Sequence, residues 1–297
     1  MSADGHSSAP PSWVADVTET LSSGGSAAST TVRDEVLEAT ARLSAAGCDT
    51  PRLDAELLVA DAMGVDRGRL WLGAEAAVND DMASAVAERI ERREQREPVA
   101  YITGSKGFRR IDLVVDRRVL IPRPETEMIV DVVLELPQRA RLHDVGTGSG
   151  AVALAAKQER PDLAVSGSDL SPDAVAVAVE NAQRLGLEVS FSVERDLPPG
   201  SYDLVTANLP YIRDDEWSSL APEMTRYEPS SSFMAGSDGL DAIRGFVAGV
   251  PPGVRVVLEH TPAQAETVRG MLAEASSLRW LDGREWVTVG TAPPRAW

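Results

Sequence analysis

The spacing of hydrophobic residues predicts helices in the first third of the chain. Apolar residues at Val32, Val36, Ala39 and Leu43 recur with the period of one helix face. The same period continues after Pro51, and a third amphipathic segment spans residues 80–93. We therefore expect a small all-α domain over residues 31–96. Its pattern fits a substrate-recognition domain and a purely structural cap equally well.

Residues from 139 onward alternate between short apolar runs and helical segments. The runs predict strands at 141–145, 163–168, 189–193, 202–207 and 254–259, and the segments predict helices at 151–159, 171–185 and 262–274. Residues 279–282 and 285–291 predict a closing antiparallel hairpin. Such alternation is typical of an α/β fold with a doubly wound, mostly parallel sheet, whose ligand site lies at the carboxyl ends of the strands.

Residues 97–124 form a predicted connector between these two parts. Residues 112–116 and 119–121 predict a short hairpin, and residues 122–127 lead into a helix. Pro124, Glu125 and Glu127 suit the first turn of that helix, because proline costs little there and carboxylates meet the positive end of the helix dipole. We place the catalytic domain at residues 125–297.

Length and composition indicate a two-domain protein of ordinary globular type. The chain has 297 residues, of which 43% are hydrophobic and 25% are charged, and no apolar run approaches the roughly 18–20 residues of a membrane span. Residues 1–30 are rich in Ser, Ala, Gly and Pro and predict a disordered tail that lacks the regions of a signal peptide. Cys48 is the single cysteine, so no intrachain disulfide is possible, which favours a cytoplasmic protein.

The charge balance and the histidines argue against two classes of site. A net charge of −17, from 46 acidic and 29 basic residues, opposes a phosphate backbone, so we expect no nucleic-acid partner. His143 and His260 lie near predicted strand ends without cysteines or acids at metal-binding spacing. We interpret both histidines as structural and expect no metal site.

A glycine-rich turn, Asp144-Val-Gly-Thr-Gly-Ser-Gly150, joins the first predicted strand of this domain directly to a helix. Glycines let a backbone turn sharply and approach a ligand at a helix N-terminus. Asp169 ends the second strand, where a carboxylate can accept hydrogen bonds from both hydroxyls of a ribose. Asp196 follows the third strand, where an adenine contact is expected. Acids at three successive strand ends indicate a cofactor site rather than isolated turns.

A second motif, Asn208-Leu-Pro-Tyr211, follows a predicted buried strand. Pro210 favours an extended Leu209, which limits the direction of the Leu209 carbonyl. A bound –NH2 group can then donate one hydrogen to the Asn208 side-chain oxygen and the other to that carbonyl, while the Tyr211 ring stacks on a planar amide or guanidinium. Such a clamp acts mainly by positioning a weak nucleophile. The tetrapeptide alone is explained equally well by a strand-ending turn with a buried tyrosine.

These motifs resemble a known enzyme family. Residues 144–150 with Asp169 are similar to the class I S-adenosylmethionine methyltransferases, whose fold is Rossmann-like, and residues 208–211 are similar to their amino-methylating Asn/Asp-Pro-Pro-aromatic motif. The resemblance is closer still to the release-factor glutamine N5-methyltransferases. It covers about residues 31–291 and is carried further by Arg96-Glu-Pro-Val-Ala-Tyr-Ile-Thr-Gly104, Leu120-Ile-Pro-Arg-Pro-Glu-Thr-Glu127, Tyr227-Glu-Pro229 and Gly236-Ser-Asp-Gly-Leu240.

The resemblance implies methyl transfer from S-adenosyl-L-methionine to the glutamine amide of the Gly-Gly-Gln loop of peptide chain release factors. It implies cofactor contacts by Asp144, Gly146, Thr147, Gly148, Ser149, Gly150, Asp169, Leu170, Asp196, Leu197 and Asn208. It assigns catalysis and substrate binding to Asn208, Leu209, Pro210 and Tyr211, and we add Glu125 and Glu127 as candidate substrate contacts.

The sequence departs from the family pattern at two places, and an alternative acceptor stays open, towards which the net charge, Leu209 and the Ser-rich tail lean slightly. Leu209 stands where the family usually has proline, which constrains the loop less, and Phe108-Arg-Arg110 is charged where the family is often aromatic or apolar. The alternative acceptor is a free amino acid such as L-arginine, whose charge Glu125, Glu127 or the cluster at residues 214–216 would neutralise. A non-catalytic binding protein is disfavoured by the cofactor acids together with Asn208, and a nucleic-acid adenine methyltransferase by the net charge.

Overall fold

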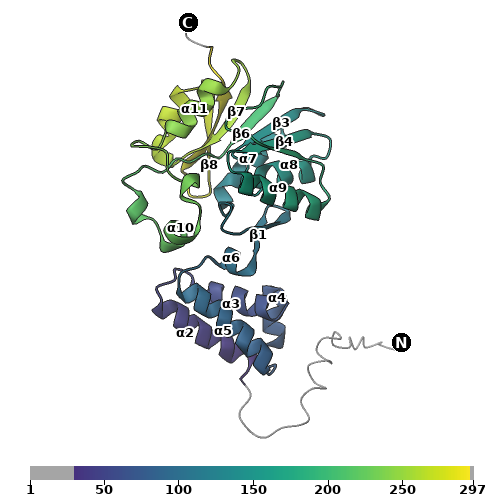
Figure 1. The fold of residues 1–297 in the computed structure, drawn as a ribbon, viewed down its shortest axis with the longest axis vertical. Helices are drawn as coiled ribbons and strands as arrows, with labels where there is room; N and C mark the ends of the chain where they lie inside the picture. The colour runs from purple at the N-terminus through teal and green to yellow at the C-terminus, as the bar shows by residue number, and fades with distance from the viewer. Residues whose placement is uncertain (1–29, 295–297) are drawn as a thin grey trace, which may run out of the picture. The chain divides into compact units, whose positions relative to one another are not determined.

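The computed structural model describes residues 30–294, which fall into two compact units (Figure 1). Unit 1 runs to Thr103 and unit 2 begins at Gly104. The predicted tail at residues 1–30 lies, apart from Thr30, outside the described residues. No helix within residues 30–294 is long and apolar enough to cross a membrane.

Unit 1 is all-α, as its hydrophobic spacing predicts. Its elements are α2 (Val32–Ala45), α3 (Pro51–Ala62), α4 (Arg67–Leu70), the 3-10 turn η1 (Trp71–Gly73), α5 (Asp80–Glu94) and α6 (Val99–Thr103). Thr31 caps α2 through reciprocal hydrogen bonds with Asp34, and Asn79 caps α5 by accepting from the Met82 amide at 2.9 Å. These caps satisfy N–H groups that the first helical turn leaves unpaired.

The core of unit 1 is apolar and contains one buried ion pair. Leu43, Leu58 and Ile90 pack together from α2, α3 and α5. Arg93 donates to Asp54 at 2.8 Å, and each side chain is only 7% exposed. A pair buried this deeply is costly to break, because either partner alone would be an uncompensated charge. Helix α6 extends this unit beyond residue 96, where we placed the end of the helical domain.

Unit 2 is built on a mostly parallel sheet of seven strands in the order β5-β4-β3-β6-β7-β9-β8. The parallel strands are β3 (Arg141–Val145), β4 (Ala164–Asp169), β5 (Ser190–Val193), β6 (Leu204–Ala207) and β7 (Arg255–Glu259). The antiparallel strands are β8 (Ala273–Arg279) and β9 (Glu285–Thr291), and β9 pairs with β7. This is the predicted doubly wound α/β sheet with its closing hairpin.

The helices of unit 2 pack on this sheet and leave its carboxyl edge for a ligand. They are α7 (Glu127–Leu134), preceded by the 3-10 turn η2 (Pro124–Thr126), then α8 (Ala151–Glu159), α9 (Pro172–Leu185), α11 (Asp241–Gly249) and α12 (Ala265–Gly270). Helices α7, α8 and α9 lie side by side (Figure 1). Strand β3 lies between β4 and β6, so the chain reverses its winding there, and such a reversal opens a crevice at the strand ends.

The predicted connector hairpin was assigned to the wrong residues. The structure pairs β1 (Ser105–Phe108) with β2 (Ile111–Val114), and residues 119–121 form no strand. Arg109, with φ +51°, makes the turn, so the charged segment that departs from the family pattern is the hairpin tip. Val119 and Ile121 are buried within a loop, which explains why their apolar character was mistaken for that of a strand.

Two further elements differ from the prediction. Helix α12 ends at Gly270 rather than residue 274, because Ala273 already pairs with Thr291 and Glu274 has a left-handed backbone at φ +52°. The closing hairpin therefore starts earlier than residue 279. Between β6 and β7 the structure contains four short elements that the hydrophobic pattern did not indicate, namely η3 (Trp217–Ser219), α10 (Pro222–Tyr227), η4 (Ser230–Ser232) and α11.

Candidate active site

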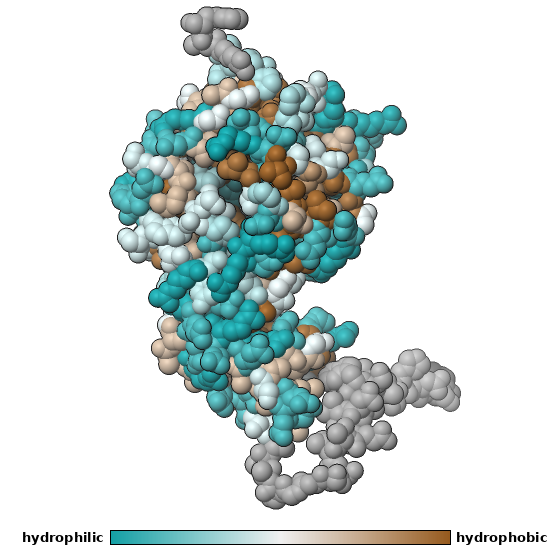
Figure 2. Space-filling view, in the orientation of Figure 1, coloured by the Kyte–Doolittle hydropathy of each residue, from teal (hydrophilic) through white to brown (hydrophobic). Residues whose placement is uncertain are grey.

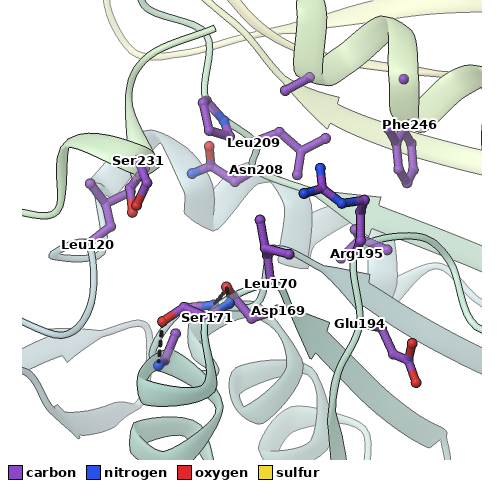
Figure 3. A pocket seen from close by; sticks show the side chains of 18 of the residues that line it. Leu120, Asp169, Leu170, Ser171, Glu194, Arg195, Asn208, Leu209, Ser231 and Phe246 are labelled. Atoms are coloured by element: carbon purple, nitrogen blue, oxygen red, sulfur yellow. Dashed lines mark hydrogen bonds between the residues drawn. The ribbon is translucent and has the colours of Figure 1, made fainter.

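A cavity of about 520 Å³ lies at the carboxyl ends of the parallel strands of unit 2 (Figure 3). This volume is typical of sites for cofactors and small ligands. Loops after β3, β4, β5 and β6 form one wall, and the segment before η2, the region of η4, and α11 form the rest. Figure 2 shows hydrophobic residues gathered beside a hollow in one face of this unit. Leu170, 57% exposed, is one of the apolar residues that line the cavity.

The glycine turn after β3 presents backbone to this cavity. Gly148 has φ +55°, and a Cβ built on it would meet no heavy atom within 4 Å, so the turn is open to a ligand. Gly146 has φ +69°, and a Cβ there would lie 3.0 Å from Leu209 Cδ2. The glycine turn and the Asn208-Leu-Pro-Tyr211 motif therefore pack directly against each other, and the left-handed backbone at position 146 favours glycine.

Asp169 lies at the end of β4 with its carboxylate held by two backbone amides. Oδ2 accepts from the Gly148 amide at 2.9 Å and Oδ1 from the Ser171 amide at 2.9 Å (Figure 3). Both residues and Asp169 line the cavity. A carboxylate anchored in this way keeps acceptor sites for hydroxyl groups. The pair of Asp169 and exposed Leu170 fits a ribose beside an apolar ring face, and Asp196 and Leu197 line the same cavity after β5.

Four predicted cofactor residues do not line the cavity: Asp144, Thr147, Ser149 and Gly150. Asp144 is 2% exposed and accepts from Thr147 Oγ1 and Thr206 Oγ1, each at 2.8 Å. Burial raises the pKa of its carboxyl to about 6. Asp144 therefore joins the glycine turn to β6, and its role in the structure is to shape that turn.

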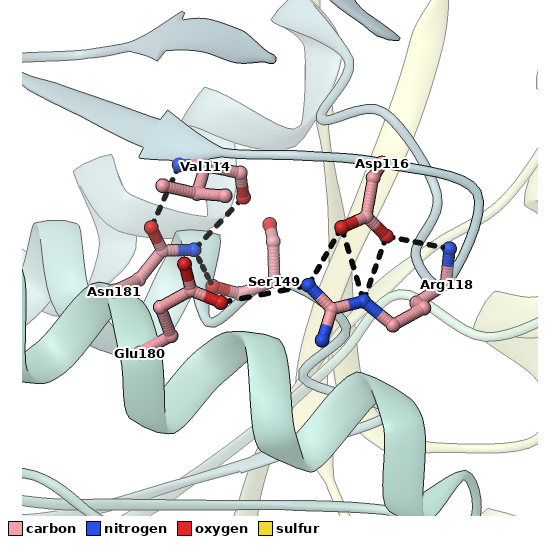
Figure 4. A network of polar contacts seen from close by, with 6 residues as sticks. All are labelled: Val114, Asp116, Arg118, Ser149, Glu180 and Asn181. Atoms are coloured by element: carbon pink, nitrogen blue, oxygen red, sulfur yellow. Dashed lines mark hydrogen bonds and ion pairs between the residues drawn. The ribbon is translucent and has the colours of Figure 1, made fainter.

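Asn181 supports the glycine turn from α9, and sequence reasoning missed it. Its side-chain nitrogen donates to the carbonyls of Ser149 and Val114, each at 3.0 Å, and its oxygen accepts from the Val114 amide at 2.7 Å (Figure 4). Asn181 is fully buried. An amide within the apolar face of a helix was the available signal, since a buried amide needs such partners.

Asn208, Leu209 and Pro210 line the cavity directly after β6. The Asn208 side-chain nitrogen donates to Thr126 Oγ1 at 3.1 Å. Within residues 30–294 no protein group donates to Asn208 Oδ1 or to the Leu209 carbonyl. Two acceptors on residues that line the cavity are thus without a protein donor.

Tyr211 is placed differently from the expectation that it would stack on the acceptor. It does not line the cavity. Its hydroxyl donates to Glu259 Oε1 at 3.1 Å, and its carbonyl accepts from Gln264 Nε2 at 3.0 Å. Burial, with the neighbouring Glu259 carboxyl, raises the pKa of the Tyr211 phenol well above its usual value. The ring therefore belongs to the support behind the motif.

The acids proposed as substrate contacts also lie away from the cavity. Neither Glu125 nor Glu127 lines it. Glu127 Oε1 accepts from the Arg109 amide at 3.1 Å, which ties α7 to the hairpin tip.

The segments around residues 121 and 228 meet beside the cavity. Glu228 is 6% exposed, accepts from the Ile121 amide at 2.9 Å and from Arg123 Nη2 at 2.6 Å. Leu120 and Pro229, next to these contacts, line the cavity. This ion pair therefore joins two segments of the cavity wall that are distant in sequence.

The histidines have ordinary buried roles. His143 contacts Ser166 Oγ at 2.8 Å and Ser168 Oγ at 2.9 Å, and burial lowers its pKa to about 4. His260 contacts Thr288 Oγ1 at 2.7 Å. In the part of the chain that the structure describes, no group of three or more His, Cys, Asp or Glu residues is arranged to hold a metal ion.

Comparison with known proteins connects both units to one family. Residues 36–104 match the model described as PrmC N-terminal domain, and residues 143–227 match a model described as methyltransferase domain. The release factor glutamine methyltransferase of Rhodospirillum rubrum is 39% identical, over 78% of this chain and 74% of that protein. The enzyme of the same name from Cereibacter sphaeroides is 38% identical, over 88% of this chain and 98% of that protein.

Proposed function

Because this chain belongs to the family of release factor glutamine methyltransferases, we propose that it methylates the side-chain amide nitrogen of a glutamine in a peptide chain release factor. The methyl donor is S-adenosylmethionine, and the acceptor is the glutamine of the Gly-Gly-Gln loop that the family resemblance implies. The observation that carries the proposal is the pair of free acceptors, Asn208 Oδ1 and the Leu209 carbonyl, on residues that line the same cavity as the glycine turn and Asp169.

The residues of the β3 and β4 ends would hold the cofactor. Asp169 would accept hydrogen bonds from the ribose hydroxyls of the cofactor. Gly148 would let the cofactor come close to the backbone of the turn, and Leu170 and Leu197 would contact the adenine. Asp196 would accept from the adenine amino group. When bound, S-adenosylmethionine supplies a methyl group made electrophilic by its sulfonium.

Asn208 and Leu209 would orient the acceptor nitrogen. A glutamine amide is a weak nucleophile, so its rate depends on how well it is held for in-line attack. Asn208 Oδ1 and the Leu209 carbonyl each accept one hydrogen of the –NH2 group, and this fixes the direction of the nitrogen lone pair. The nitrogen becomes acidic once it is methylated, so its proton can leave late and no strong general base is needed.

The structure offers no observation in favour of the free amino acid alternative. A guanidinium is permanently charged, and its burial without a partner costs several kcal/mol. Glu125 and Glu127, which were the candidate partners, do not line the cavity. The neutral glutamine amide needs only the two acceptors that are present. We propose that unit 1, which matches the PrmC N-terminal domain, contributes to recognition of the release factor, and that the enzyme acts in the cytoplasm.

The test is methyl transfer from labelled S-adenosylmethionine. The protein is incubated with a release factor, with the same release factor carrying alanine for the loop glutamine, and with a mixture of free amino acids. We expect label in the unmodified release factor alone. Label in the glutamine-to-alanine release factor would place the acceptor elsewhere, and label in the free amino acids would overturn the assignment.

A further inference from the structure

A buried glutamine lies behind the segment that follows β6. Gln264, the last residue of the 3-10 turn η5 (Pro262–Gln264), is 8% exposed. Its side-chain nitrogen donates to the backbone carbonyls of Tyr211 at 3.0 Å, Asp238 at 3.3 Å and Gly239 at 3.2 Å. Within residues 30–294, no other group donates to the Tyr211 carbonyl. Three buried acceptors therefore depend on a single –NH2 group, and a buried carbonyl without a donor is costly.

Thr261 fixes the direction in which the Gln264 amide points. The Thr261 backbone amide donates to Gln264 Oε1 at 3.0 Å, and the Thr261 hydroxyl donates to the same oxygen at 3.0 Å. A backbone N–H can only donate, so the atom that faces it must be the side-chain oxygen. The opposite orientation would set that oxygen against three carbonyls and the nitrogen against an N–H group. Gln264 is therefore held as a donor to the Tyr211 carbonyl.

Tyr211 is anchored at two points as a result. Its carbonyl accepts from Gln264, and its hydroxyl donates to Glu259 Oε1 at 3.1 Å. Only Pro210 separates Tyr211 from Leu209, and the proline ring fixes the φ angle between them. Few backbone rotations are left between the anchored tyrosine and the Leu209 carbonyl, which is one of the two acceptors of the proposed clamp.

The same –NH2 group holds the segment that leads into α11. Asp238 and Gly239 shortly precede Asp241, which begins α11 and lines the cavity. A Cβ on Gly239 would lie 2.4 Å from the Tyr211 carbonyl oxygen and 2.7 Å from Gln264 Nε2, so the two segments are in direct contact. Gln264 thus joins the segment after β6 to the start of a helix that forms part of the cavity wall.

We propose that Gln264 is a positioning residue for methyl transfer, which holds the Tyr211 carbonyl and thereby sets the direction in which the Leu209 carbonyl meets the acceptor –NH2. This inference rests on the proposed function, because it assigns a role within the same reaction. Gln264 does not line the cavity. It therefore acts through Tyr211 and Pro210, and it makes no contact with the substrate.

The first variant is Gln264→Met, which keeps the length of the side chain and removes its donor and its acceptor. The segment after the motif should stay folded, because other backbone hydrogen bonds hold it. The Ile212 amide donates to the Phe233 carbonyl at 2.7 Å, and the Ile212 carbonyl accepts from the Ala235 amide at 3.0 Å. The variant should therefore release the Tyr211 carbonyl without unfolding this segment.

The kinetic measurement is methylation of a release factor with saturating S-adenosylmethionine. In Gln264→Met, kcat should fall by about 10-fold to 100-fold, because the acceptor nitrogen is no longer aligned. The KM for the release factor, and the affinity for S-adenosylhomocysteine measured by calorimetry, should each stay within about threefold, because the interaction is lost mainly in the transition state. Gln183→Met, at an exposed site on α9, is the matched control and should change none of these quantities.

A spectroscopic readout reports on the Leu209 carbonyl without any turnover. Carbon-13 at leucine carbonyls together with nitrogen-15 at prolines selects the Leu-Pro bonds in an NMR spectrum, and these follow Leu136, Leu197 and Leu209. In Gln264→Met the Leu209 carbonyl signal should shift. The Leu136 signal should not, because Leu136 lies in the loop after α7. A general loss of structure would move both signals and lower cofactor affinity as well.

Thr261 supplies a second pair of variants for the case in which Gln264→Met fails to fold. Thr261→Val removes one of the two donors to Gln264 Oε1 and leaves the backbone amide in place. Its kcat should fall by a smaller factor, about threefold to 10-fold, and the Leu209 signal should shift in the same direction. Thr261→Ser keeps the hydroxyl and should restore both quantities.

Two results would overturn the inference: a kcat for Gln264→Met within about twofold of normal, or an unmoved Leu209 signal. If that variant does not fold, normal turnover or an unmoved Leu209 signal in Thr261→Val has the same meaning. A loss of cofactor affinity as large as the loss of kcat would also overturn it, because Gln264 would then support the whole cavity. If the unmodified enzyme methylates the release factor while these variants behave normally, only the positioning role fails. If it labels no release factor, the proposed function itself fails.

Discussion

The two halves of the proposed active site are held in place by different means. In the cofactor half, at the ends of β3 and β4, the contacts that hold Asp169 are closer in sequence. Asp169 is bound by the amides of Gly148, 21 positions away, and Ser171, two positions away. The acceptor half, at the end of β6, depends on distant residues. Asn208 is held by Thr126, 82 positions away, and Tyr211 by Glu259 and Gln264, 48 and 53 positions away.

This difference indicates which substitutions each half tolerates. The partners of Asp169 are backbone amides, which any non-proline residue provides. The partners of Asn208 and Tyr211 are specific side chains, so the acceptor half is lost when any of them changes chemically. We therefore expect damage to the cofactor half to weaken binding, and damage to the acceptor half to slow turnover while cofactor binding stays intact.

The largest effect should follow Asn208→Ala. This change removes the oxygen that aims the acceptor nitrogen in the proposed clamp, and a mispositioned nucleophile loses rate on the order of 10²-fold or more. Affinity for S-adenosylhomocysteine should be nearly unchanged, because Asp169 and Gly148 are untouched. Steady-state methylation of the release factor, together with calorimetry, measures both quantities. Near-normal turnover in this variant would remove Asn208 from the clamp.

The matching change in the cofactor half is Asp169→Asn. It removes the charge that strengthens hydrogen bonds to the ribose hydroxyls, which is worth about 1.5 to 3 kcal/mol. Affinity for S-adenosylhomocysteine should therefore fall by roughly 10-fold to 150-fold. Asp173→Asn, at the exposed first turn of α9, is the control and should leave the affinity unaltered. Equal affinity in the two variants would show that Asp169 makes no contact with the cofactor.

The same contrast explains what the sequence could predict. Strand β3, helix α8 and the glycine turn with Asp169 are consecutive along the chain, so hydrophobic periodicity and glycine spacing predicted them directly. Thr126, Glu259 and Gln264 have no local signature, because each contacts the segment after β6 from a distant part of the chain. Glu259 and Gln264 come near this segment only when β6 and β7 become neighbours in the sheet. The placement of Tyr211 against Glu259, rather than on the cavity, is a consequence of the same pairing.

The prediction of the connector hairpin was wrong for a related reason. Its strands were assigned from apolar residues, but Val119 and Ile121 are buried without a strand partner. The real ladder, Ser105 to Val114, is set by its turn and by register. Burial and strand pairing are separate events, and a short apolar run does not distinguish them.

Two glycine variants, one in each half, compare how the two halves depend on backbone conformation for stability. Gly239 has φ +72°, and a Cβ there would lie 2.4 Å from the Tyr211 carbonyl oxygen. Gly239→Ala should therefore lower the free energy of unfolding by about 1 to 3 kcal/mol and reduce turnover. Gly148→Ala, in open space at φ +55°, has the backbone cost without the clash, so it should destabilise less but weaken cofactor binding. Denaturant titration and calorimetry give the two values, and a larger stability loss for Gly148→Ala would reverse the expected order.

The smallest effect should come from the acidic cluster after the motif. Asp214 is exposed and does not line the cavity, and the neighbouring Arg213 pairs with Asp215. Exposed charges contribute at most about 1 kcal/mol, and a neutral glutamine amide has no charge for Asp214 to neutralise. Asp214→Asn should therefore change the KM for the release factor by less than about twofold. A cationic acceptor behaves differently, because it loses a counter-charge and its KM should rise roughly 10-fold. The measurement is the KM of this variant with the release factor and with free arginine. A large change in KM for arginine alone would show that the acceptor half binds a cation. Charge, rather than distant side-chain contacts, would then be what distinguishes the acceptor half from the cofactor half.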